Sequence, residues 1–194
     1  MTKKTSSFFN MVSTLFVVTF LSSAALGYVY ELTKGPRAAA DLAKKNEAIK
    51  EVLPEYDNNP LDEKYEITTK DGYKLTCYPA KKDGKLVGTA IETFTNKGFN
   101  GIIRLMVGFL PDGTIYDISV IEEKETPGLG NKMEKDKSDF SKQFKGKNPK
   151  FFKLKVKKDG GDVDAITAAT ISSRAFCDAV DRAYKAYMAS KKNY

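Results

Sequence analysis

Two short stretches combine residue types that could hold a flat or anionic organic ligand. The first reads Glu-Thr-Pro-Gly-Leu-Gly at residues 125–130. Its proline fixes one turn dihedral, and its two glycines permit positive φ angles and a close approach of the backbone to a ligand. A tight loop that only joins a strand to a helix would have the same composition. On the residues alone, both interpretations stay open.

The second stretch reads Asp-Ala-Ile-Thr-Ala-Ala-Thr-Ile-Ser-Ser at residues 164–173, directly before a predicted helix. Small and hydroxyl residues ahead of a helix expose backbone N–H groups, and these groups with the helix dipole form an anion site suited to a phosphate. A capping segment rich in Ser and Thr is the alternative. The stretch lacks the GxxxxGK[ST] pattern of a P-loop, which argues against nucleotide hydrolysis.

The composition excludes several classes of site. Histidine is absent, which rules out Ser/His/Asp hydrolysis, His-paired cysteine nucleophiles and His ligands to haem or zinc. Cys77 and Cys177 are too few for an iron–sulfur cluster or an all-cysteine zinc site, and we expect both to be buried free thiols. Chemistry must therefore come from carboxylates, hydroxyls, lysines, backbone amides or a bound organic cofactor.

The positive charge of the chain does not indicate nucleic-acid binding. The net charge is +7, and eight lysines fall within residues 142–158. In residues 152–157 these lysines alternate with apolar residues, as on the solvent face of a strand. We therefore expect no nucleic-acid partner.

The N-terminal region predicts a membrane anchor. Residues 5–30 contain no charged side chain, a run of 26, which is long enough to span a bilayer as a helix. We expect a cytoplasmic tail over residues 1–7 and a transmembrane anchor over residues 8–30. A cleaved signal peptide is the alternative, because residues 23–25 offer a small-residue cleavage site, but the apolar stretch continues past them.

The charges around this span leave its orientation open. Lys3 and Lys4 precede it, and Lys34 and Arg37 follow it, so the positive-inside bias is weak. A short tail ahead of a long domain is typical of a signal anchor, which would place the domain outside the cytoplasm.

The remaining chain predicts an α+β architecture with an antiparallel sheet and flanking helices. Residues 31–60 form a helical connector, with a helix over residues 37–53 that Pro54 ends, and residues 61–194 form the main domain. Asp-Gly turns at 71–72, 83–84 and 112–113 separate β-rich runs. These predicted strands cover residues 73–78, 86–94, 102–110 and 115–121.

The last third of the chain predicts a surface helix over residues 132–147, a strand over residues 150–157 and a terminal helix. Apolar residues at helical spacing over 175–188 indicate the terminal helix, and Ser172 or Ser173 would be its N-cap. Arg174 could contact a phosphate or be exposed. The Gly-Phe-Asn-Gly segment at 98–101 is a second close-approach loop or a simple hairpin connection.

The second stretch resembles the covalent flavinylation motif D-x-x-[ST]-G-A-T of bacterial FMN-binding domains, and the first is identical to the ETPGLG loop that these domains carry upstream. The resemblance implies that a flavin transferase attaches FMN through its phosphate to the hydroxyl of Thr170. Ala168 stands where the family most often has glycine. Because alanine is compatible with ordinary backbone angles, we do not expect it to abolish attachment.

The same resemblance names the residues expected around the cofactor. They are Asp164, Ala165, Thr167, Ala168, Ala169, Thr170, Ile171 and Ser172 from the second stretch, and Glu125, Thr126, Gly128, Leu129 and Gly130 from the first.

Both motifs, the anchor and the length together resemble the G subunit of the Rnf ion-translocating oxidoreductase (electron transport) complex. This implies a single-pass protein of the inner membrane with a periplasmic domain, which passes electrons within a complex that couples ferredoxin:NAD⁺ electron transfer to ion movement and is no catalyst alone. Alternatives are a stand-alone FMN carrier for an extracytoplasmic reductase, the related C subunit of Na⁺-translocating NADH:quinone oxidoreductase, and a structural or lipid-facing module without flavin.

Overall fold

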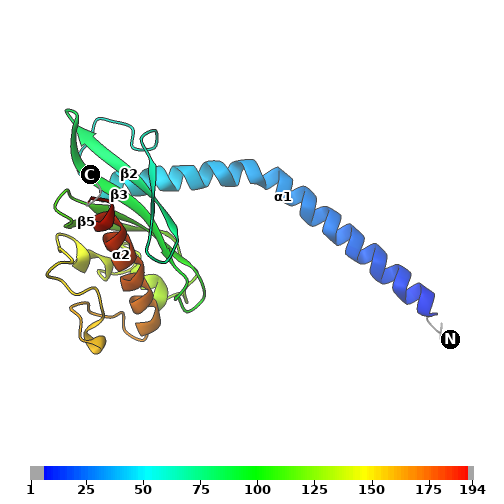
Figure 1. Ribbon diagram of the computed structural model, residues 1–194. Coiled ribbons are helices and arrows are strands. Elements are labelled where there is room, and N and C mark those ends of the chain that lie inside the picture. The colour runs from blue at the N-terminus through cyan, green and yellow to red at the C-terminus, as the bar shows by residue number, and fades with distance from the viewer. Residues whose placement is uncertain (1–6, 192–194) are drawn as a thin grey trace. The chain divides into compact units, whose positions relative to one another are not determined.

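The computed structural model describes residues 7–191 and divides into two compact units, Met1–Ala43 and Lys44–Tyr194. The predicted cytoplasmic tail lies, apart from residue 7, outside the described residues. Figure 1 traces the helices and strands of both units. The fold class is α+β, as predicted, with one long N-terminal helix, a five-stranded antiparallel sheet and a C-terminal helix.

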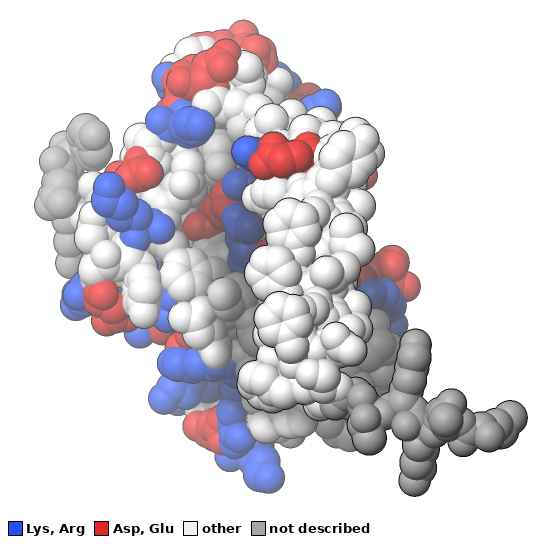
Figure 2. Space-filling view, turned by 90° about the vertical axis from the view of Figure 1, so that its right-hand side faces the viewer, with Lys and Arg blue, Asp and Glu red and all other residues white. Residues whose placement is uncertain are grey.

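The first unit consists of the N-terminal part of helix α1, which covers Phe8–Val52. It is long and apolar enough to cross a membrane, and the apolar stretch is not buried inside the protein. Figure 2 shows the uncharged side chains of this stretch as a white surface. The hydroxyls of Thr14 and Thr19 donate to the carbonyls of Asn10 (2.7 Å) and Leu15 (2.8 Å), so these polar groups are satisfied within the helix, as a lipid environment requires.

The helix predicted over residues 37–53 is confirmed up to Val52, but its predicted start at residue 37 is wrong, because α1 runs without a break from Phe8 to Val52. Pro36 lies inside it. A proline normally clashes with the Cβ of the preceding residue when that residue is helical, but residue 35 is glycine and has no Cβ. The helix ends at Val52, just before Pro54, close to the predicted boundary.

The second unit contains one antiparallel sheet in the order β1-β2-β3-β4-β5. Its strands are β1 Tyr65–Thr68, β2 Lys74–Lys82, β3 Lys85–Thr95, β4 Ile103–Phe109 and β5 Ile115–Glu122. The four predicted strands are confirmed, and the three Asp-Gly turns connect β1 to β2, β2 to β3 and β4 to β5. Asp83 and Gly84 have φ angles of 51° and 73°, the two positive values that a type I′ hairpin requires.

Helices cover both faces of this sheet. Side chains alternate between the faces along each strand, so Leu105 and Val107 belong to the core beneath the C-terminal helix and Met106 belongs to the core beneath the end of α1. Ile49 and Val52 of α1 fill the second core. The last two turns of α1 are therefore part of the domain.

Helix α2, Thr170–Lys191, packs across the other face of the sheet, where it appears in red in Figure 1. The predicted apolar stripe is confirmed, because Phe176, Val180 and Ala183 are fully buried. The helix starts at Thr170, earlier than predicted, so Ser172 and Ser173 are not its N-cap.

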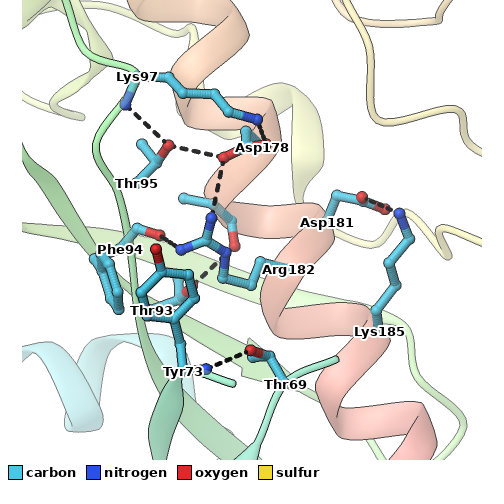
Figure 3. Close-up of polar contacts among 11 residues, drawn as sticks. Thr69, Tyr73, Thr93, Phe94, Thr95, Lys97, Asp178, Asp181, Arg182 and Lys185 are labelled. Atoms are coloured by element: carbon cyan, nitrogen blue, oxygen red, sulfur yellow. Dashed lines mark hydrogen bonds and ion pairs between the residues drawn. The ribbon is translucent and has the colours of Figure 1, made fainter. Parts of the chain in front are cut away.

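Polar contacts fix the register of α2 on the sheet (Figure 3). The guanidinium of Arg182 lies 5.0 Å from the ring centre of Tyr73 and 5.1 Å from that of Phe94. It also donates to the carbonyl of Phe94 (3.0 Å) and pairs with Asp178 one turn earlier. The hydroxyl of Thr93 donates to the carbonyl of Ala179 at 3.0 Å.

The surface helix predicted over residues 132–147 is wrong. This region forms two short 3₁₀ helices, Gly130–Met133 and Ser141–Phe144. The hydroxyl of Ser138 donates to the carbonyl of Lys132 (2.5 Å) and accepts from the N–H of Phe140 (3.1 Å), and such local bonds compete with helix formation. The helical spacing reflects loop residues that anchor in the core, such as Phe140, whose ring centre lies 5.2 Å from that of Phe176.

The strand predicted over residues 150–157 is also wrong. Its backbone pairs with the nearby loop instead of the sheet: the N–H of Lys153 donates to the carboxylate of Asp162 (2.7 Å), and Val156 forms one parallel bridge with Val163. The predicted alternation of apolar and exposed residues is present, but no strand accompanies it. A 3₁₀ helix over Lys157–Asp159 follows.

Candidate functional site

Three segments that are distant in sequence meet around one open cavity of about 320 Å³. They are the loop between β3 and β4, the loop after β5 and the start of α2. We call this cavity the three-segment pocket. Its lining residues are Phe99, Glu125, Thr126, Leu129, Gly130, Ala168, Ala169, Thr170, Ile171 and Ser172.

The carboxylate of Glu125 joins the three segments. Its Oε1 accepts a hydrogen bond from the backbone N–H of Asn100 (3.0 Å), and its Oε2 accepts a short one from the hydroxyl of Ser172. The side-chain amide of Asn100 donates to the hydroxyl of Thr126 at 3.2 Å. Glu125 is only 4% exposed, so these bonds replace the water that its oxygens would otherwise bind.

Two glycines make room for this carboxylate. A Cβ on Gly98 would lie 2.9 Å from Oε1 of Glu125, and a Cβ on Gly130 would lie 2.8 Å from Oε2 and 2.5 Å from the hydroxyl of Ser172. Real Cβ atoms essentially never approach so closely. The last glycine of the ETPGLG stretch therefore permits close packing around Glu125.

Thr170 is half-buried and is the first residue of α2. The N–H of Ser173 makes the first helical bond, to the carbonyl of Ala169 (3.0 Å), so the amides of residues 170–172 precede the regular helical ladder. The positive end of the helix dipole lies at the same place. This end of α2 is therefore suited to a phosphate next to the Thr170 hydroxyl.

Ala168 departs from the expectation of ordinary backbone angles. Its φ is 58°, in the left-handed region that favours glycine. The loop makes a tight turn here, in which the N–H of Ala169 donates to the carbonyl of Ile166 (3.0 Å) and the hydroxyl of Ser173 accepts from the N–H of Ile166 (2.9 Å). A glycine, which the motif resembled by residues 164–170 has at this position, would adopt this conformation without strain.

The rim of the three-segment pocket is apolar. Phe99, Leu129 and Ile171 are 64%, 40% and 48% exposed, and they come one from each segment. Such a rim suits a flat aromatic ligand, because each side chain can cover part of the ligand's face. The segment at 98–101, which the sequence offered as a second close-approach loop or a hairpin connection, does reach the pocket through Phe99, although Phe99 was not among the thirteen expected site residues.

Nine of the thirteen expected site residues line the pocket, and four do not: Asp164, Ala165, Thr167 and Gly128. The exposed carboxylate of Asp164 pairs with Lys157 at 2.7 Å. Arg174 forms an ion pair with Asp159 at 2.7 Å, so its guanidinium already has an acidic partner.

The two cysteines lie outside the pocket. Both are free and buried, as expected. Burial raises the pKa of each thiol to about 12, because a thiolate would lose its hydration there. Within residues 7–191, no group of three or more Cys, Asp or Glu side chains could hold a metal ion.

One known protein family matches the part of the chain that contains this pocket. The family described as "FMN-binding domain" matches residues 98–185, a range that contains all three pocket segments. The residues present fit such a cofactor: a hydroxyl at a helix N-terminus, backbone amides beside it and an apolar rim.

Curated relatives match over most of the chain, and each is named as the G subunit of an ion-translocating oxidoreductase complex. The protein of Erwinia tasmaniensis is 43% identical over 68% of this chain and 66% of its own length. That of Salmonella typhi is 37% identical over 84% of this chain and 82% of its own. That of Vibrio cholerae is 32% identical over 87% and 85%. The chain belongs to the family of G subunits of ion-translocating oxidoreductase complexes.

Proposed function

We propose that this chain is the membrane-anchored electron-transfer subunit of an Rnf-type complex and carries FMN in a phosphoester bond to Thr170. The observation that carries the proposal is the position of Thr170, which is the first residue of α2 and lines an apolar-rimmed pocket. The name of the relatives, which makes each of them part of an ion-translocating oxidoreductase complex, supports the assignment to a multi-subunit membrane complex.

The residues of the pocket have distinct proposed roles. Thr170 provides the oxygen of the phosphoester, and the amides of residues 170–172 with the α2 dipole offset the remaining negative charge of the phosphate. Phe99, Leu129 and Ile171 hold the ring system of the cofactor and exclude water from its faces. FMN, when bound, accepts electrons and passes them on, and the protein contributes position and electrostatics.

The remaining assignments follow from the same proposal. Residues 8–30 anchor the chain in the inner membrane, and residues 61–194 form the FMN-binding domain on the periplasmic side. Residues 31–60 connect the two, and the last turns of α1 within them pack into the core of the domain. A flavin transferase attaches the cofactor after synthesis. A covalent bond keeps FMN on the protein in a compartment where free FMN is scarce.

The test is ultraviolet fluorescence of the denatured protein in a gel, after expression with a flavin transferase. The wild-type band should fluoresce, and the Thr170→Ala band should be dark. Thr68→Ala is the matched control, because Thr68 is an exposed threonine at the end of β1 that lies outside both motifs and does not line the pocket, and its band should stay bright.

Two outcomes would overturn the assignment to Thr170. One is a dark wild-type band while a known flavinylated protein is bright in the same cells, and the other is a bright Thr170→Ala band.

A further inference from the structure

The three-segment pocket contains a buried acidic group that attachment of a phosphate does not require. Glu125 is 4% exposed, and within residues 7–191 no lysine or arginine forms an ion pair with it. Burying a carboxylate without a cation is costly unless other groups stabilise its charge. The position of Glu125 on the pocket wall therefore indicates a purpose beyond packing.

Both oxygens of the Glu125 carboxylate have hydrogen-bond partners. One accepts from the N–H of Asn100 and the other from the hydroxyl of Ser172, and such bonds favour the charged form of a carboxyl group. Ser172 is the third residue of α2, so the charge also lies at the positive end of the helix dipole, which favours it.

The packing around Glu125 fixes this charge in place. Gly98 and Gly130 allow the backbone of two separate segments to approach the two oxygens, and the bonds from Asn100 and Ser172 hold the carboxylate there. A charge that is held in water-poor surroundings acts more strongly on its neighbours than a charge at the exposed surface.

We propose that Glu125 lowers the reduction potential of the flavin that the pocket holds. The inference rests on the proposed attachment of FMN. Two electrons and one proton convert an oxidised flavin to its anionic reduced form, and this adds one negative charge to the ring. A fixed carboxylate at the pocket wall repels that added charge, so the reduced form becomes less favourable. Glu125 is thus a positioning and tuning residue, and it takes no part in electron transfer itself.

The experiment is a reductive titration of the flavinylated full-length protein in detergent, with dithionite as the reductant, which is oxidised to sulfite. The flavin absorbance gives the midpoint potential against a redox dye. Glu125→Gln removes the charge and keeps the shape, and we expect its potential to rise. Ser172→Ala keeps the charge but removes a donor that partly neutralises it, and we expect its potential to fall.

The two variants should shift the reduction potential in opposite directions if Glu125 tunes the flavin. If the substitutions only loosened the structure, both would shift the potential in the same direction. Glu66→Gln is the matched control: this exposed acid on β1 pairs with Lys74 at 3.0 Å, and its removal should leave the potential unchanged. The shift in Glu125→Gln should also persist at high salt, because ions screen a buried charge poorly.

A wild-type potential in Glu125→Gln would overturn the inference, as would a shift of the same sign in Ser172→Ala. If Glu125→Gln fails to take up flavin, the Ser172→Ala titration decides alone: a lowered potential supports the inference, and an unchanged or raised one overturns it. Gel fluorescence of the wild type is read first, so failure of the proposed attachment is seen separately.

Discussion

Ala168 adopts a backbone conformation that strains an L-residue and not a glycine. Its φ of 58° lies in the left-handed region, where an alanine is less stable by about 1–2 kcal/mol. The flavinylation motif that residues 164–170 resemble has glycine here. The sequence showed the substitution, but the angle that makes it costly depends on the turn formed by Ile166 and Ala169, which no spacing rule reveals.

Ala168→Gly should therefore stabilise the domain. The relief of strain exceeds the extra chain entropy that glycine gives the unfolded state, so we expect a gain of about 1 kcal/mol in the free energy of unfolding. Urea unfolding followed by circular dichroism measures it. Ala165→Gly, at an exposed position of the same loop without a positive φ, is the control and should give no gain. If Ala168→Gly is no more stable than the wild-type protein, the backbone at Ala168 is not strained.

The thiols of Cys77 and Cys177 should be unreactive in the folded protein. Both have a pKa raised to about 12 by burial, so at pH 8 the reactive thiolate is scarce and inaccessible. We expect no reaction with Ellman's reagent under native conditions and two thiols per chain after denaturation. Rapid labelling of the native protein would show that one of the two sites is open.

The same thiols predict that the stability of the folded protein decreases at alkaline pH. Their pKa in the folded protein lies above the value of an unfolded chain, so the folded state binds more protons between the two values. Their contribution to stability is complete below pH ~8.5, the pKa of a free thiol, and is lost as the pH rises toward 12. Replacing Cys177 by Ala should make the decline in stability between pH 9 and 11 less steep.

At the scale of elements, the sequence predicted what local signals control. Asp-Gly turns and alternating runs indicated β2, β3, β4 and β5, and an apolar stripe indicated α2. The prediction failed where buried aromatic residues lie in loops. Phe140 and Phe144 have helical spacing, but hydrogen bonds between side chains and the backbone limit this region to a short 3₁₀ helix. The prediction also could not show that Phe99 joins the pocket, because that contact depends on the packing of three loops.

The contact between α1 and β4 depends on one glycine. A Cβ on Gly108 would lie 1.7 Å from the carbonyl oxygen of Val52, so the end of α1 can pack on the sheet only because this position has no side chain. Gly108→Ala should cost about 2 kcal/mol or more in the free energy of unfolding, since the helix must shift. Gly88→Ala, whose Cβ would lie 3.1 Å from its nearest neighbours, should cost less. Equal losses in urea unfolding would contradict the account.

At the scale of the whole molecule, an apolar helix and a charged domain occur in one chain. α1 carries an exposed apolar stretch long enough for a membrane, and its last turns form part of the domain core. We expect the full-length protein to stay in the membrane fraction after alkaline carbonate extraction, with an intact mass that includes residues 8–30. A mature protein cleaved after residue 25 and found in the soluble fraction would support the signal-peptide alternative instead.

The central claim is the bond between FMN and Thr170, and mass spectrometry tests it most directly. Trypsin should release Asp159–Arg174, because it cleaves after Lys158 and Arg174, and this peptide contains both Thr167 and Thr170. In protein from cells with a flavin transferase, the peptide should gain the mass of FMN less one water, and fragmentation should place it on Thr170. An unmodified peptide from such cells, or FMN on Thr167, would contradict the account.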